Sequence, residues 1–216
     1  MSETLFFVLE LIGTIAFAAS GAMVGLKKGM DIFGVAILGL CTAVGGGVIR
    51  DLVLGITPPV TFQDPVYALI AIATSIAVFL PAVRSRLERG SRLYDVVMLM
   101  DSIGLGVFTV VGVQSAYSVS SSYSIFLLAF VGVITGVGGG VLRDVLAGDT
   151  PYIFVKHFYA CASLIGALLC SLAWMPLGST AATLLGAAAV VALRLCAAYF
   201  RWNLPKASPS PGGARR

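Results

Sequence analysis

Seven long apolar stretches alternate with short polar segments along the 216-residue chain. A helix needs about 20 mostly apolar residues to cross the hydrocarbon core of a bilayer, and each stretch has roughly that length. We therefore predict an all-α membrane protein with seven transmembrane helices, their ends placed to within about 2–4 residues. The predicted spans are 5–26, 32–54, 66–83, 93–116, 123–147, 157–175 and 177–200. Pro176 and Gly178 separate the last two by a very short gap, so six spans remain an alternative.

Composition supports a membrane protein and argues against other classes. Hydrophobic residues make up 58% of the chain and charged residues 11%, whereas a soluble domain has about 45–50% and about 25%. Basic residues do not cluster before the tail, so nucleic acid is not an expected partner. The four cysteines lie in apolar stretches without metal-ligand spacing. The sequence has no nucleophile–base constellation, HExxH or Walker motif, so we expect neither an enzyme nor a cofactor.

The Lys and Arg residues of the loops predict the orientation of the chain. They follow the first, third and fifth spans and lie in the tail: Lys27, Lys28, Arg84, Arg86, Arg89, Arg92, Lys156, Arg201, Lys206, Arg215 and Arg216. The other loops have none. Because short cytoplasmic loops carry the excess of positive charge, we expect the N-terminus outside and the C-terminus in the cytoplasm. The tail 204–216, rich in Pro, Gly and Ser, is expected to be disordered.

Two segments of the chain repeat one another. Residues 42–58 (TAVGGGVIRDLVLGITP) and 135–151 (TGVGGGVLRDVLAGDTP) are identical at 11 of 17 positions. The similarity extends upstream, where Glu10 aligns with Asp101 and Phe17 with Phe108. We therefore predict a first three-helix repeat over 1–92, a second over 93–176 and an additional span over 177–203. Three helices are an odd number, so the copies enter the membrane from opposite faces, as in many transport proteins.

The repeated segments each contain a glycine triplet, Gly45, Gly46 and Gly47 in the first and Gly138, Gly139 and Gly140 in the second. Glycines of a spanning helix often allow neighbouring helices to pack closely. They also permit a kink or an unwound turn, whose freed carbonyls can face a cation path. The recurrence of the triplet beside an Arg-Asp pair favours the second interpretation, with monovalent cations at these carbonyls.

Charged residues inside predicted spans are the other candidates for function, because charges at membrane depth usually face a bundle interior or an aqueous cavity. The candidates among them are Glu10, Arg50, Asp51, Asp101, Arg143 and Asp144. We predict the pairs Glu10–Arg50 and Asp101–Arg143. Adjacent Arg and Asp project about 100° apart on a helix, so we expect one to pair between helices while the other faces the path. A purely structural role for the pairs is about equally favoured.

Four other residues receive simpler interpretations. Lys27 and Lys28 mark orientation, with binding of anionic membrane lipid as a second interpretation. His157 is expected at the cytoplasmic surface beside Lys156. Arg194, near the inner end of the last span, is expected to snorkel to the interface.

The paired GGGxxRD segments, each followed by G-x-T-P in a seven-span chain, resemble the bacterial trimeric intracellular cation (TRIC) channel family over about residues 5–200. The resemblance implies a homotrimer in the bacterial inner membrane with one pore per protomer. It also implies that spans one, two, four and five line the pore, that spans two and five are kinked at the triplets, and that K⁺ and Na⁺ permeate.

Two further functions compete with a cation channel. Some bacterial members of the family are described as glycine transporters, and inverted repeats are typical of alternating access. A secondary transporter for glycine or another small amino acid is therefore the alternative, and a non-conducting lipid-binding assembly is the third.

Overall fold

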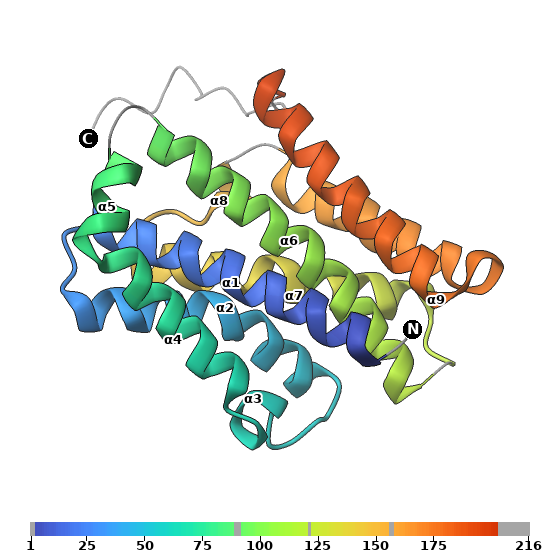
Figure 1. Ribbon diagram of the computed structural model, residues 1–216. Coiled ribbons are helices and arrows are strands. Elements are labelled where there is room, and N and C mark those ends of the chain that lie inside the picture. The colour runs from blue at the N-terminus through green and yellow to red at the C-terminus, as the bar shows by residue number, and fades with distance from the viewer. Residues whose placement is uncertain (1–2, 89–91, 121, 156–157, 203–216) are drawn as a thin grey trace, which may run out of the picture.

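The computed structural model describes residues 3–88, 92–120, 122–155 and 158–202, and within these ranges all regular secondary structure is helical (Figure 1). The helices are α1 (Glu3–Lys27), α2 (Ile32–Val53), α3 (Val60–Gln63), α4 (Val66–Phe79), α5 (Pro81–Glu88), α6 (Arg92–Val119), α7 (Ile125–Leu146), α8 (Tyr152–Val155) and α9 (Tyr159–Tyr199). Five of them are long and apolar enough to cross a membrane, and α4 is a shorter apolar helix.

Helix α9 accounts for two of the predicted spans. Its 41 residues contain Pro176 and, at Gly178, a non-helical backbone with φ 78° and ψ 160°. Glycine adopts this positive φ without a Cβ penalty, so the chain reverses there and its last part returns beside the first (Figure 1). The molecule therefore has the seven-span plan, and the six-span alternative is wrong.

The third predicted span, 66–83, ends earlier than expected. Helix α4 stops at Phe79, and Leu80 has an extended ψ of 137° before Pro81 opens α5. A residue that precedes proline is disfavoured in the helical region, which explains the break. The predicted basic loop from Arg84 is thus helical to Glu88.

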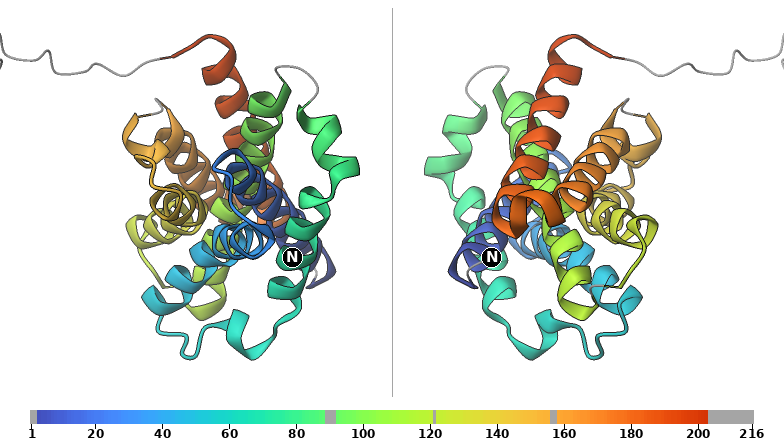
Figure 2. Two further views of the ribbon diagram at one scale, coloured as in Figure 1. Left: turned by 90° about the vertical axis from the view of Figure 1, so that its left-hand side faces the viewer. Right: turned by 90° about the vertical axis from the view of Figure 1, so that its right-hand side faces the viewer.

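The two repeats pack against each other in opposite directions. Helices α1 and α6, which begin the two repeats, run antiparallel through the middle of the bundle (Figure 1). Helix α1 packs on α2 and α6, while α7 packs on α2 and α6. The third helix of each repeat covers its own pair on opposite flanks, α4 on one side and α9 on the other (Figure 2).

Two equivalent phenylalanines meet where the repeats face each other. The ring centroids of Phe17 and Phe108 are 5.3 Å apart. Each ring packs on the glycine of the other repeat: the Phe17 ring occupies the place of a Cβ at Gly104, and the Phe108 ring would lie 3.1 Å from a Cβ at Gly13. The symmetry of the sequence is therefore also a symmetry of packing in the centre of the protein.

Candidate functional site

The two glycine triplets are the place where α2 and α7 cross. A Cβ added at Gly46 would overlap the backbone carbonyl oxygen of Thr135, and one at Gly139 would overlap that of Thr42. The two contacts are equivalent under the repeat. Because a backbone carbonyl cannot move aside as a side chain can, only glycine fits at these positions.

Both triplets lie inside uninterrupted helices, from Ile32 to Val53 and from Ile125 to Leu146. The unwinding predicted at these glycines is therefore wrong, whereas monovalent cations at their carbonyls stay a prediction. Close packing, the simpler interpretation of the sequence, accounts for the middle glycines. A bend of the helix axis without loss of helix stays a prediction.

The last glycine of each triplet has a different environment. Gly140 lies against Tyr159, whose hydroxyl would be 2.7 Å from an added Cβ. At Gly47 the nearest atom would be Nη2 of Arg50 at 3.8 Å, an ordinary contact distance. Gly47 therefore borders free space, which matters for the cavity described below.

Five residues of the first repeat form an outer cluster, named for the predicted orientation. Nε of Arg50 donates to Oδ1 of Asp51 at 2.8 Å, and Nη1 of Arg50 lies 3.7 Å from Oε1 of Glu10. The Tyr67 hydroxyl donates to Oε2 of Glu10 at 2.5 Å. The backbone amide of Val60 donates to Oδ2 of Asp51 at 2.9 Å. The cluster thus connects α1, α2, α3 and α4.

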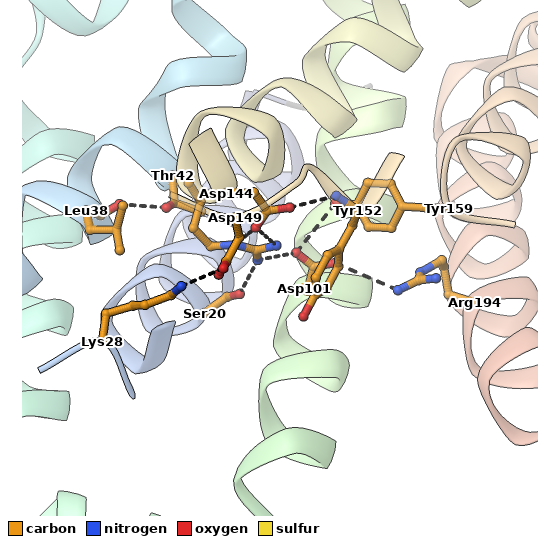
Figure 3. A network of polar contacts seen from close by, with 11 residues as sticks. Ser20, Lys28, Leu38, Thr42, Asp101, Asp144, Asp149, Tyr152, Tyr159 and Arg194 are labelled. Atoms are coloured by element: carbon orange, nitrogen blue, oxygen red, sulfur yellow. Dashed lines mark hydrogen bonds and ion pairs between the residues drawn. The ribbon is translucent and has the colours of Figure 1, made fainter. Parts of the chain in front are cut away.

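The second repeat builds an inner cluster around Arg143, whose side chain is fully buried. Figure 3 shows Ser20, Asp101, Asp144 and Tyr152 of this cluster. Nη1 of Arg143 donates to Oδ1 of Asp101 at 2.6 Å and to the hydroxyl of Ser20 at 2.7 Å. Its Nε donates to Oδ1 of Asp144 at 2.9 Å. The amide of Tyr152 donates to Oδ2 of Asp144 at 2.8 Å. Ser20 belongs to α1, so this cluster also ties the second repeat to the first.

Arg194 joins the inner cluster from α9. It is 6% exposed, its guanidinium lies 4.7 Å from the ring centroid of Tyr159, and its Nη2 is 3.9 Å from Oδ2 of Asp101. The predicted snorkelling of Arg194 to the interface is therefore wrong. An ionised carboxylate in the protein interior offers more stabilisation to this guanidinium than the apolar surroundings of a lipid-facing position would.

Both predicted ion pairs, Glu10–Arg50 and Asp101–Arg143, are present. The expectation that one member of each Arg-Asp pair bonds between helices while the other faces the path stays a prediction. The sequence did not predict that Nε of each arginine also donates to the aspartate that follows it. A long, flexible guanidinium side chain spans the angle that separates the two Cα–Cβ bonds.

The tyrosines and the amide donors of the clusters were not predicted. Tyr67 and Tyr159 are 92 positions apart, as are Val60 and Tyr152. The repeated segments themselves are 93 positions apart. The offset of 92 appears only when the alignment is continued past the G-x-T-P turn. Continuing it would have identified the two tyrosines.

Each cluster borders a cavity. The outer one, of about 30 Å³, is lined by Glu10, Arg50 and Gly47 together with Thr14 and Tyr67. A volume of this size holds one or two waters. The inner cavity, of about 260 Å³, has a different lining, made of Met23, Val24, Lys27, Lys28, Tyr94, Val97, Asp144, Asp149 and Tyr152.

The segment of α1 between the two cavities is closed by packing. Along this helix Thr14 lines the outer cavity and Met23 the inner one. Between them lie Phe17, packed on Phe108, and Ser20, hydrogen-bonded to Arg143. The space between the two cavities is therefore filled by the packed rings of Phe17 and Phe108 and by the buried guanidinium of Arg143.

The inner cavity opens between two loops joined by an ion pair. Nζ of Lys28 lies 2.5 Å from Oδ1 of Asp149, with both side chains partly exposed. This pair holds the loop after α1 beside the loop after α7, so these two loops lie on one side of the protein. Lys27 lines the same cavity. Lys156, His157 and the tail 204–216 lie outside the described residues.

Comparisons with known proteins agree with this geometry. The profile of a family described as "Glycine transporter" matches residues 7–82 and 98–175, two segments that correspond to the two repeats. The chain is 38% identical over 206 residues to the UPF0126 inner membrane protein YadS of Escherichia coli, covering 93% of this chain and 94% of that protein. It is 35% identical over 201 residues to YvgT of Bacillus subtilis, covering 93% and 96%.

Solved structures are similar over nearly the whole chain. One comes from work on conductance through TRIC cation channels, with 37% identity, coverage of 96% of this chain and 99% of that one, and a TM-score of 0.84. Another is the TRIC channel orthologue from Rhodobacter sphaeroides, with 31% identity, coverage of 93% and 100%, and a TM-score of 0.84.

Fold and clusters together define a multi-pass, inverted-repeat membrane protein with a charged constellation on each side of its centre. The chain belongs to the bacterial family described as glycine transporter, and its membership of the TRIC family, expected from the GGGxxRD segments, is confirmed.

Proposed function

We propose that the protein is a cation-permeable channel with a pore in each protomer, through which K⁺ and Na⁺ pass. The pore is lined by α1, α2, α6 and α7 and runs from the outer cavity to the inner one. The observation that carries the proposal is the pair of mirrored charged clusters, each bordering a cavity on its own side of a packed centre.

The outer cluster has the charge that a cation path needs. One guanidinium, that of Arg50, faces two carboxylates, those of Glu10 and Asp51, so the cluster carries one net negative charge. Carboxylates in a narrow, low-dielectric mouth raise the local concentration of cations. In the described state the centre is closed, and conduction requires Phe17, Phe108 and the Arg143–Ser20 contact to separate.

The assembly proposed is a homotrimer in the bacterial inner membrane, with the N-terminus outside. Relatives named as inner membrane proteins and as trimeric cation channels support this proposal, as do the Lys and Arg residues of the loops. Mass determination of the detergent-solubilised protein tests the trimer, since a protomer or dimer mass would contradict it.

Purified protein in planar bilayers tests the channel directly. We expect discrete unitary currents that reverse near the Nernst potential of potassium in a KCl gradient. Saturable counterflow of glycine in liposomes, without unitary currents, would overturn the proposal.

A second candidate is a transporter for glycine or another small amino acid. One observation favours it: the inner cavity combines ammonium groups of Lys27 and Lys28 with carboxylates of Asp144 and Asp149. These groups suit the two charges of a zwitterion, and a packed centre between two cavities suits alternating access. The glycine counterflow measurement above decides between the two candidates.

A further inference from the structure

The charged residues and the tyrosine of the two clusters match one for one, and Arg194 is the charged residue of the inner cluster that has no counterpart. Glu10, Arg50, Asp51 and Tyr67 of the outer cluster have the counterparts Asp101, Arg143, Asp144 and Tyr159 in the inner one. Arg194 lies in the last span, which follows both repeats and has no counterpart in either. The inner cluster therefore has one cationic group more than the outer.

The side chain of Arg194 is enclosed by other parts of the protein. Its side chain is 7% exposed and rests on the ring of Tyr159 at 4.7 Å. Its Nη2 faces Oδ2 of Asp101 at 3.9 Å. That oxygen is buried and has no hydrogen-bond partner among the described residues, and within the same residues Nε of Arg194 has none either. The guanidinium thus compensates the carboxylate by charge, without a hydrogen bond that would fix the two groups together.

This extra charge changes the balance of the inner cluster. Arg143 alone would leave Asp101 and Asp144 with one net negative charge, as Arg50 leaves the outer pair. Arg194 brings the inner cluster to neutrality. Asp144 lines the inner cavity, where Lys28 is paired with Asp149 and Lys27 adds a further positive charge. The described groups beside the outer cavity therefore carry a net negative charge, and those beside the inner cavity carry a net positive one.

We propose that Arg194 sets an asymmetry of cation conduction by neutralising the inner cluster. The inference rests on the proposed channel function. Cations concentrate at the outer mouth and are depleted at the inner one, so they enter more readily from the Glu10 side than from the Lys28 side. Arg194 acts through Asp101 and lines neither the outer nor the inner cavity, so it is a positioning residue that tunes the field of the path.

The proposal is tested by recording unitary currents of the wild-type protein and of Arg194→Met in symmetric KCl. For each protein, the conductance at one voltage is compared with that at the equal and opposite voltage. A cleft lined by charges of one sign changes the local cation concentration by about 10- to 1,000-fold, and a single charge that acts through Asp101 should do less, so we expect the ratio of larger to smaller conductance to move toward one by roughly twofold. Lys27 still opposes full symmetry. The effect should be large near about 0.1 M salt and small near about 1 M, where screening shortens to about 3 Å.

Two further variants keep the test decisive. Arg194→Lys preserves the charge and loses the planar stacking on Tyr159, so we expect the wild-type ratio. Arg194→Gln removes the charge but retains a donor for Asp101, so it should match Arg194→Met and serves where the methionine variant does not fold. An unchanged ratio in folded Arg194→Gln, or a shifted ratio in Arg194→Lys, would overturn the inference. Absence of currents from the wild-type protein would instead contradict the channel itself.

Discussion

At the scale of single residues, the two predicted ion pairs differ strongly in strength. Arg143 is fully buried and makes bonds of 2.6–2.9 Å to Asp101, Ser20 and Asp144. The Arg50–Glu10 pair spans 3.7 Å, and the Glu10 side chain is 14% exposed. A repeated sequence therefore produced one tight and one loose version of the same contact.

This difference predicts unequal costs for equivalent substitutions. Asp101→Asn leaves a buried guanidinium with one carboxylate fewer, and loss of one partner of a buried pair costs about 3–5 kcal/mol. Glu10→Gln should cost less, about 1–3 kcal/mol, because the pair spans 3.7 Å and glutamine can still accept the Tyr67 hydrogen bond. Thermal unfolding in detergent measures both. Equal destabilisation by the two variants would contradict the difference in burial and distance.

The ion pairs could be predicted from the sequence because the repeat aligned each acid with its arginine. The sequence did not predict that each arginine also bonds the aspartate next to it. Helical geometry fixes only the direction of the Cα–Cβ bond, and a long arginine side chain can still turn toward its neighbour. Arg194 was misjudged for a related reason: the sequence shows its depth in the span but not which face of the helix meets Asp101.

At the scale of helices, the glycine triplets stabilise a crossing. The middle glycines, Gly46 and Gly139, each face a backbone carbonyl of the other helix, whereas Gly47 faces open space. The sequence predicted that the triplets matter but favoured an unwound helix over close packing. Only the contact partner across the interface distinguishes these outcomes, and a single helix's sequence does not contain it.

We predict that Gly46→Ala destabilises the protein by about 1–3 kcal/mol, the usual cost of overpacking. Gly47→Ala is the matched control one residue away. The new methyl group has room there, and alanine is favoured over glycine in a helix by about 0.8–1.0 kcal/mol, so the variant should be neutral or more stable. Thermal unfolding of both variants checks this. If Gly47→Ala lost as much stability as Gly46→Ala, the assignment of Gly46 to the helix crossing and of Gly47 to open space would be wrong.

At the scale of the whole molecule, the inverted repeat places a cavity on each side of a closed centre. The sequence predicted the number of spans and their opposed directions, because hydrophobic length and repeat parity determine both. It did not predict the short helices α3 and α8, which supply amides to Asp51 and Asp144 from just after the two turns. Each of these helices has only four residues, which is too short for a hydrophobic period to show in the sequence.

Orientation in the membrane is tested by single cysteines in a background lacking Cys41, Cys161, Cys170 and Cys196. Lys28 lies on the predicted cytoplasmic side and the exposed Thr57 on the outer side. An impermeant maleimide added to intact cells should label Thr57→Cys and spare Lys28→Cys. The reverse pattern would invert the proposed topology.

The central claim, a cation path through the outer cavity of each protomer, is tested most directly by blocking that cavity during a recording. In the cysteine-free background, Gly47→Cys places a thiol in the cavity lining, and Leu52→Cys places one on the outside of α2, where Leu52 is 56% exposed. A bulky cationic thiol reagent added on the outer side should abolish unitary currents of Gly47→Cys and leave those of Leu52→Cys unchanged. Currents that persist in Gly47→Cys after mass spectrometry has verified its modification would contradict the claim.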